Sequence, residues 1–374
     1  MAIKNLELRL YICLCLFNVI TFGNSRIEIY GFYIGIVIFF SLFLYSKKIP
    51  INSLFSIFCL LFLSLPYFSF DNLYQLQYLI YLMPVCFISF AYKKNEIYEC
   101  VYQVFKIYSL ISIILFIFGV GKGFGYGFPR MHGLLSEPSA FSIIGVFLYL
   151  SSIINKKVSD FILVIILLFL VQSLTFIICI VISTLLYLTI CLNIKYRILA
   201  ILLSLVSLFL FYEIIIYTND VIDNVNLHRF TEGIINVATL GDEGYNPRFE
   251  SVLAIFDYAG KHGLWFGQGL NAGEIYSIET NRIRDLNFWL ELQLSFGLIG
   301  FIFVFLIFIF KFLLSEINTR RNEFNVLFIS FFSFCSVNSA QGIVFQQFFI
   351  VCIFLLMIRD VDIQSKSMTP RKNA

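Results

Sequence analysis

The feature that most constrains this chain is an alternation of long apolar segments and loops, in which every second loop is basic. About twelve apolar segments approach the roughly 20 residues that a helix needs to cross a bilayer, and the shorter ones require an adjustment of tilt or membrane thickness. They cover residues 8–22, 29–46, 51–68, 74–92, 101–119, 136–154, 158–172, 174–194, 198–217, 293–314, 324–340 and 343–358. The alternation predicts an all-α, polytopic integral membrane bundle of about 12 transmembrane helices, with residues 1–374 forming a single domain.

The placement of Lys and Arg predicts the orientation of this bundle, because positive charge is retained on the cytoplasmic side of a membrane. The four short loops between the basic ones contain a single basic residue, Arg26. We therefore expect cytoplasmic termini and external chemistry. The basic loops and the tail contain Lys4 and Arg9, Lys47 and Lys48, Lys93 and Lys94, Lys156 and Lys157, Lys195 and Arg197, Lys311 with Arg320 and Arg321, and Lys366, Arg371 and Lys372.

Composition agrees with a membrane protein. Sixty per cent of the residues are apolar and only 13% are charged, which excludes an ordinary soluble domain. The formal charge of +3 reflects residues that determine topology, and it gives no indication of nucleic-acid binding. The nine cysteines lie in or beside apolar segments without a CxxC pair, so we interpret them as small core residues.

Two parts of the topology admit a second interpretation. The stretch 158–194 is too long for one span, and dividing it at Gln172–Thr175 keeps every later basic loop inside. A single span would instead place Lys195 and Arg197 outside. The first segment is short and basic at its start like a signal peptide, but it lacks a small-x-small cleavage site after Phe22.

Two external loops are the best candidates for function. The first covers residues 120–135 and the second covers residues 217–286, and a long loop on one face of a bundle is usually functional. External loops that are rich in Lys and Arg are contrary to the positive-inside rule. The simplest explanation is that their positive charge binds an anionic ligand. The two loops hold all three histidines (His132, His228, His262) and seven of the eight external basic residues: Lys122, Arg130, Arg229, Arg248, Lys261, Arg282 and Arg284.

Arg130 and Glu137 carry the candidate chemistry of the first loop. Glu137-Pro138 opens a span, where proline suits the first turn and an acid complements the helix dipole, so a capped helix is one interpretation. The other adds a carboxylate close to the Arg130 guanidinium that orients or deprotonates a hydroxyl, with His132 in reserve as base. The alternating glycines from Gly121 are not preceded by a predicted strand or followed by a GK[ST] sequence, as a phosphate-binding loop would be. We therefore expect a flexible segment after the preceding helix.

The long loop contains several residues with two interpretations each. Arg248 opens an amphipathic run and is either a solvated surface residue or a pyrophosphate ligand, since its fork matches phosphate oxygens. Trp265 is either a membrane-interface anchor or a platform for a sugar ring. Gly267-x-Gly269 predicts a tight turn, or a place where backbone approaches a ligand. Residues 281–293 predict an amphipathic helix with acid and amide groups, which either leads back into the membrane or lies on its surface.

Several kinds of site are not indicated by the sequence. The three histidines are dispersed, without HxH or HxxxH spacing, so we expect no metal site. Neither a GxSxG nucleophile elbow nor a Walker motif occurs. Polar residues near the outer end of the last two spans line a cavity or make helix–helix hydrogen bonds: Ser336, Asn338, Ser339, Gln341, Gln346 and Gln347.

Taken in order, these motifs resemble those of the Wzy-type O-antigen polymerases and, more broadly, of the O-antigen ligase/polymerase superfamily. The length and the number of spans also match that family over essentially the whole chain. Three features carry the resemblance: Arg130-x-x-Gly133-x-x-x-Glu137-Pro138-Ser139 at the start of a span, the helix at Arg248 followed by Gly267-x-Gly269, and Asn287 through Gly297-Leu-Ile-Gly300.

The resemblance implies a GT-C-like glycosyltransferase of the bacterial inner membrane that needs neither metal nor cofactor. Its substrate would be an undecaprenyl-diphosphate-linked oligosaccharide at the periplasmic face, and a separate co-polymerase would regulate chain length. Glu137, Arg130 and His132 would then be catalytic. Diphosphate would be bound by Arg248, Arg282, Arg284 and Arg229, and the acceptor sugar by Asn287, Trp265 and Gln268. Cationic donors would stabilise the leaving group in an inverting displacement.

Three other interpretations compete with a polymerase. Ligases of this superfamily carry a histidine just before the asparagine of the third motif, where this chain has Leu286, and this difference favours a polymerase. A transporter or lipid flippase predicts ionisable residues at mid-bilayer and paired broken helices, and the sequence indicates neither. A scaffold without catalysis leaves the cationic outer loops unexplained.

Overall fold

The computed structural model describes residues 5–17, 19–22, 25–29, 31–46, 83–84, 86–88, 91–125, 128–135, 137–191, 247–269, 272–280, 288–314 and 323–337. The predicted spans 51–68, 198–217 and 343–358 lie outside these residues, as does most of 74–92. Over the described residues the chain is mostly helical, as predicted. The helices are α1 (Leu6–Cys15), α2 (Gly31–Ser46), α5 (Lys94–Ile117), α6 (Ser142–Asn155), α7 (Val158–Val171), α8 (Leu174–Cys191), α11 (Pro247–His262), α12 (Ala272–Thr280), α13 (Phe288–Leu314) and α14 (Glu323–Val337).

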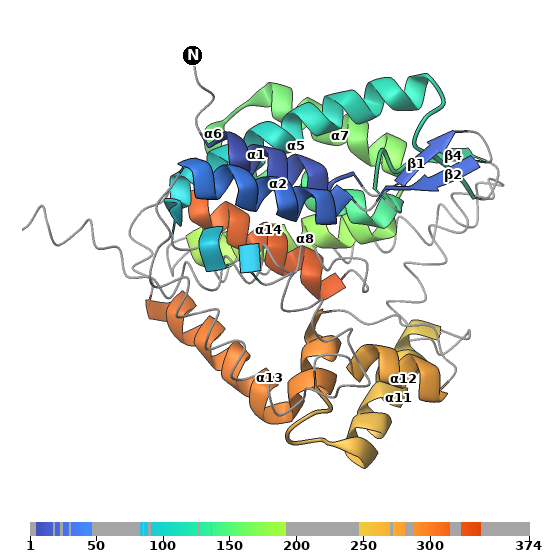
Figure 1. Cartoon of the computed structure of the whole chain (residues 1–374), viewed down its shortest axis with the longest axis vertical. Helices are drawn as coiled ribbons and strands as arrows, with labels where there is room; N and C mark the ends of the chain where they lie inside the picture. The colour runs from blue at the N-terminus through green and yellow to red at the C-terminus, as the bar shows by residue number, and fades with distance from the viewer. Residues whose placement is uncertain are drawn as a thin grey trace, which may run out of the picture.

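Helix α6 is the centre of the largest core. Eleven of its 14 residues are buried, and it packs against α5, α7, α8 and α14 (Figure 1). Gly145 permits the close approach of α8, because a Cβ there would lie 1.8 Å from the ring of Phe176 on that helix. An apolar sequence on all sides of a helix is what a central position requires. Figure 1 shows α11 and α12 beside the first half of α13, away from this core.

Two helical stretches have the length and composition to cross a membrane. They are Asn95–Ile117 in α5 and Pro138–Asn155, which joins the short 3₁₀ helix η2 (Pro138–Phe141) to α6. The remaining apolar helices of the described residues are shorter: Tyr33–Tyr45, Val158–Val171, Thr175–Leu188, Trp289–Ile302 and Asn325–Val337. These two helices are compatible with the predicted membrane character, but two such helices also occur in the cores of soluble proteins.

The structure departs from the all-α expectation at two β-hairpins. Strands β1 (Val19–Phe22) and β2 (Ser25–Glu28) form one antiparallel pair, and β3 (Lys122–Gly125) and β4 (Phe128–Met131) form the other. The predicted first span, 8–22, is therefore wrong in extent, because α1 ends at Cys15. Residues 19–22 are three β-branched residues and Phe22, which favour an extended pleat over a helix. Hydrophobicity alone did not distinguish the strand from the end of a span.

The stretch 158–194 contains two helices, as the charge pattern predicted. Helix α7 ends at Val171, and its C-cap, Gln172, has a left-handed backbone with φ of 46°. Helix α8 then begins at Leu174. A left-handed residue ends a helix and allows the chain to reverse direction. Gln172 and Ser173 lie at the polar break that the sequence indicated.

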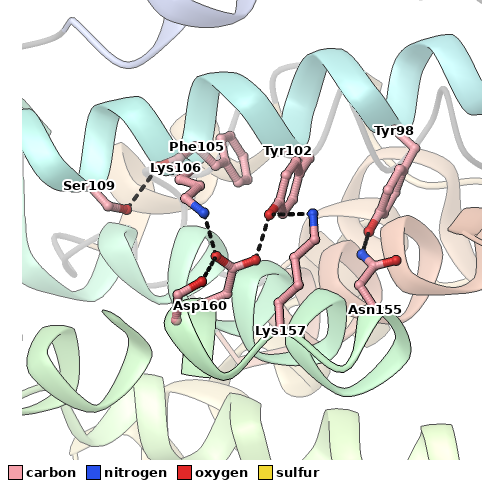
Figure 2. A network of polar contacts seen from close by, with 9 residues as sticks. Tyr98, Tyr102, Phe105, Lys106, Ser109, Asn155, Lys157 and Asp160 are labelled. Atoms are coloured by element: carbon pink, nitrogen blue, oxygen red, sulfur yellow. Dashed lines mark hydrogen bonds and ion pairs between the residues drawn. The ribbon is translucent and has the colours of Figure 1, made fainter. Parts of the chain in front are cut away.

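A polar network joins α5, α6 and α7, and the sequence analysis did not predict it (Figure 2). Asp160, whose side chain is fully buried, accepts from Lys106 Nζ at 2.6 Å and from the Tyr102 hydroxyl at 2.5 Å. Lys157 Nζ lies 4.8 Å from the centroid of the Tyr102 ring and 3.3 Å from its hydroxyl. Asn155 donates to the Tyr98 hydroxyl at 2.9 Å. Lys106 is therefore an ionisable residue inside a candidate span, contrary to the expectation that none lies there.

Candidate functional site

The β3–β4 hairpin positions Arg130 at the end of α7. Arg130 pairs with Gly123 in the hairpin register. Its guanidinium donates to the carbonyl of Gln172 at 2.8 Å and, through Nε, to that of Val171 at 3.4 Å. The last carbonyls of a helix lack partners within the helix and carry its negative dipole end, so a cation here is stabilising. Arg130 thus ties the hairpin to the α7–α8 junction with part of its five-donor group.

His132 is buried in the same region, with 3% of its surface exposed. Its Nδ1 lies 2.7 Å from the Leu135 carbonyl and its Nε2 lies 3.0 Å from the Thr21 hydroxyl. A carbonyl only accepts, so Nδ1 donates, and in the neutral ring Nε2 accepts from Thr21. Both ring nitrogens are engaged inside the protein, and this geometry favours a structural role over that of a reserve base.

Glu137 is exposed and precedes η2, with Pro138 at the start of that helix, as the sequence predicted. Its Oε2 accepts from the Ser139 hydroxyl at 3.2 Å. The residue is therefore at the surface, where an acceptor hydroxyl approaching from outside can reach it, as a general base requires.

The glycines of the first loop are held in defined conformations instead of forming the expected flexible exit. Gly121 has φ of 70° and its N–H donates to the Thr21 carbonyl at 3.1 Å, which joins the two hairpin regions. Gly133 has φ of 61°, and a Cβ there would lie 2.6 Å from Ser112 Oγ on α5. Glycine is needed at both positions because other residues rarely adopt this backbone.

The second and third sequence motifs form one structural joint. The turn after α11 and the kink inside α13 exchange four backbone hydrogen bonds: Gln268 N–H to Leu294 O, Gly269 N–H to Ser295 O, Leu298 N–H to Leu264 O and Ile299 N–H to Trp265 O. The kink is at Gly297, where φ is 66° and ψ is −172°. We call residues 264–269 with 294–299 the glycine joint.

Glycine is required on both sides of the glycine joint. A Cβ on Gly267 would lie 2.4 Å from the Ser295 carbonyl oxygen, and a Cβ on Gly297 would lie 2.3 Å from the Trp265 carbonyl oxygen. Both obstacles are backbone atoms, which cannot move aside as a side chain can. The expected tight turn at Gly267-x-Gly269 is confirmed, and the close backbone approach that it permits is to α13.

Some of the other predicted site residues of the long loop lie among the described residues and others do not. Arg248 is the second residue of α11, and only its backbone position is described. Trp265 is 59% exposed on the turn of the glycine joint. Gln268 donates from Nε2 to the Tyr258 hydroxyl at 3.2 Å, so it faces the protein. Four predicted site residues lie outside the described residues: Arg229, Arg282, Arg284 and Asn287.

A polar cluster around Tyr258 was missed by the sequence analysis. The Tyr258 hydroxyl donates to Glu279 Oε2 on α12 at 2.5 Å, and the His262 ring stacks on the Tyr258 ring at 4.3 Å between centroids. Burial raises the pKa of Tyr258, and its hydrogen bond to Glu279 raises it further. We call Tyr258, His262, Gln268 and Glu279 the Tyr258 cluster. No motif marks it, because Tyr258 and Glu279 are 21 positions apart on different helices.

Among the described residues, no group of three or more His, Cys, Asp or Glu is placed to hold a metal ion. No protein-family model matches the chain, and no curated protein matches it in sequence.

Proposed function

We propose that this protein is a membrane glycosyltransferase of the O-antigen polymerase type. It transfers an undecaprenyl-diphosphate-linked glycan onto the non-reducing end of another lipid-linked repeat unit. The reaction is a direct, inverting displacement without metal or cofactor, at the periplasmic face of a bacterial inner membrane. About 12 helices in a GT-C-like arrangement surround the site, and a co-polymerase regulates chain length.

The observation that carries the proposal is the glycine joint. The resemblance rests on motifs that are separate in sequence, and two of them, Gly267-x-Gly269 and Gly297-x-x-Gly300, meet through four backbone hydrogen bonds. This joint ties the turn after α11, the helix that carries Arg248 in its first turn, to α13. Contact between the two motifs supports the resemblance, because two chance matches would not be expected to lie close together in the structure.

In the proposed reaction the acceptor hydroxyl attacks the anomeric carbon while the bond to the diphosphate breaks. Glu137 accepts the proton of that hydroxyl, which its exposed carboxylate permits. Arg248 binds the departing lipid diphosphate, because guanidinium forks match phosphate oxygens and stabilise the charge that develops there. Arg130 positions the loop that presents Glu137, through its contacts with the end of α7.

The test compares two variants with matched controls in the native host. We expect Arg248→Ala and Glu137→Gln to collapse the surface polysaccharide ladder to the core carrying one repeat, because a single unit is still ligated. Lys261→Ala, at the other end of α11, and Glu28→Gln, an exposed acid on β2, are the controls and should leave the ladder unchanged. Amounts of protein in the membrane are matched between strains.

The pattern of loss distinguishes the competing functions. Disappearance of all repeats, including the first, would identify a ligase or a transport defect instead of a polymerase. A normal ladder in both Arg248→Ala and Glu137→Gln would remove the proposed site. A ladder that also collapses in Lys261→Ala would indicate general sensitivity of α11 and would contradict the role given to Arg248.

A further inference from the structure

The Tyr258 cluster has an exposed side that the proposed reaction does not use. Tyr258 itself is buried, with 6% of its surface exposed, while Glu279 and His262 are exposed. Glu279 is held by the Tyr258 hydroxyl and His262 by the stacked Tyr258 ring. Two exposed polar side chains are thus fixed in place by one buried aromatic residue, and such ordering lowers the entropy lost when a ligand binds.

The exposed atoms of the cluster are mainly hydrogen-bond acceptors. His262 Nδ1 lies 3.1 Å from the Tyr258 carbonyl, which only accepts, so Nδ1 carries the proton and Nε2 is the acceptor in the neutral ring. The Glu279 carboxylate has two acceptor oxygens, and Tyr258 occupies one position on one of them. Fixed acceptors at a surface suit a ligand that carries many hydroxyl donors.

Unpartnered polar atoms lie beneath this surface. The Tyr276 hydroxyl, on a residue only 1% exposed, and Gln268 Oε1 have no hydrogen-bond partner among the described residues. Tyr276 packs edge-on against Tyr258, with ring centroids 5.1 Å apart. Buried polar groups without partners are costly and are few in native proteins. The polar atoms beside Tyr258 are therefore not all satisfied by contacts among the described residues.

Two exposed aromatic side chains follow the cluster in the chain. Trp265 and Phe266, on the turn after His262, are 59% and 70% exposed. The backbone of this turn is fixed by the glycine joint. Exposed aromatic rings match the apolar face of a sugar ring.

The length of α11 decides what role this surface can have. His262 is 14 residues after Arg248 (262 − 248), which corresponds to about 21 Å along a helix at about 1.5 Å per residue. A general base must reach its proton within hydrogen-bonding distance, so His262 cannot serve a reaction centred on a diphosphate bound at Arg248. A glycan chain extending from that diphosphate can cover the same distance with several sugar rings.

We propose that the Tyr258 cluster is a glycan-binding subsite for a neutral, hydroxyl-rich segment of the polysaccharide, several sugars away from the diphosphate. Glu279 and His262 accept hydrogen bonds from sugar hydroxyls, and Trp265 packs on a sugar face. This inference rests on the proposed function for the identity of the glycan. The binding itself requires no catalysis, so it is measurable on its own.

The experiment measures binding of a lipid-free probe to the full-length protein in detergent. The probe is the repeat-unit oligosaccharide released from the host's surface polysaccharide by mild acid, and calorimetry reports its affinity. We expect Glu279→Gln and His262→Ala each to weaken binding about tenfold, which corresponds to loss of a hydrogen bond to a charged or fixed acceptor. Lys261→Ala, which alters the neighbouring exposed residue, should bind like the wild type.

Glu279→Gln is informative because the amide oxygen still accepts from Tyr258, so the cluster keeps its internal hydrogen bond. Unchanged affinity in both Glu279→Gln and His262→Ala, with thermal midpoints equal to wild type, would overturn the inference. Failure of the polymerase proposal has a different signature. In that case the Arg248→Ala ladder stays normal, while the oligosaccharide still binds and the cluster variants still weaken it.

Discussion

The buried ion pair between α5 and α7 leads to an asymmetric prediction. Asp160 has no exposed side-chain surface, whereas the side chain of Lys106 is 34% exposed. Lys106→Met therefore leaves a carboxylate inside the protein with Tyr102 as its principal remaining donor. Asp160→Asn leaves an ammonium that water can reach, and the new amide still accepts from Tyr102. We expect Lys106→Met to be the more destabilising of the two changes.

The magnitudes follow from the two environments. Removing one partner of a buried ion pair costs about 3–5 kcal/mol of stability. Protonation of the remaining carboxylate sets an upper limit to this cost, because protonating a carboxyl with an ordinary pKa near 4 costs about 4 kcal/mol at pH 7. Lys106→Met should thus cost about 3–4 kcal/mol. Asp160→Asn loses one charge-assisted hydrogen bond of a partly exposed cation, which is about 1–2 kcal/mol. The double variant strands no charge and should cost less than the sum.

Thermal unfolding in detergent, followed by loss of the monodisperse chromatographic peak at one heating rate, tests this order. At about 2 °C per kcal/mol, the midpoint should fall by about 6–8 °C in Lys106→Met and by about 2–4 °C in Asp160→Asn. The double variant should fall by less than the two single shifts added together. A larger loss in Asp160→Asn, or strictly additive shifts, would refute the reasoning, because either result means that no buried charge is stranded.

Four further predictions concern three glycines and Tyr258. Gly267→Ala should destabilise the protein by more than about 2 kcal/mol in the same thermal assay, because its Cβ meets the backbone of α13. Gly260→Ala on α11, where a Cβ meets nothing within 4 Å, should be neutral or stabilise by up to about 1 kcal/mol. Gly145→Ala should lower the midpoint, and adding Phe176→Leu should recover part of the loss; no recovery would exclude the predicted clash. The pKa of Tyr258 is higher in the folded protein than in the unfolded chain, where it is about 10, so the stability that this group contributes is complete below pH 10 and is lost as pH rises through the folded pKa. Tyr258→Phe should therefore reduce the loss of stability above pH 10. An unchanged dependence of stability on pH would contradict this.

Long-range contacts explain why parts of the candidate site were not predicted. The sequence indicated a turn at Gly267-x-Gly269, and the turn exists; Gly297 was marked only as part of a motif. It gave no sign that the two positions touch, because the hydrogen bonds between them join residues about thirty positions apart. Nor did it mark Lys106 and Asp160 as a pair, since they lie on different helices, 54 positions apart.

The sequence by itself determined the features that depend on local pattern. Apolar runs predicted helices, the polar break at Gln172 separated α7 from α8, and Glu137-Pro138 predicted the start of the helical segment that continues as α6. These features follow from periodicity, dipole and backbone preference, which neighbouring residues specify. Only the tertiary structure decided that His132 is enclosed, and that Tyr258 joins two helices into one exposed polar surface. Burial and pairing depend on residues distant in the chain, and one-dimensional spacing does not record them.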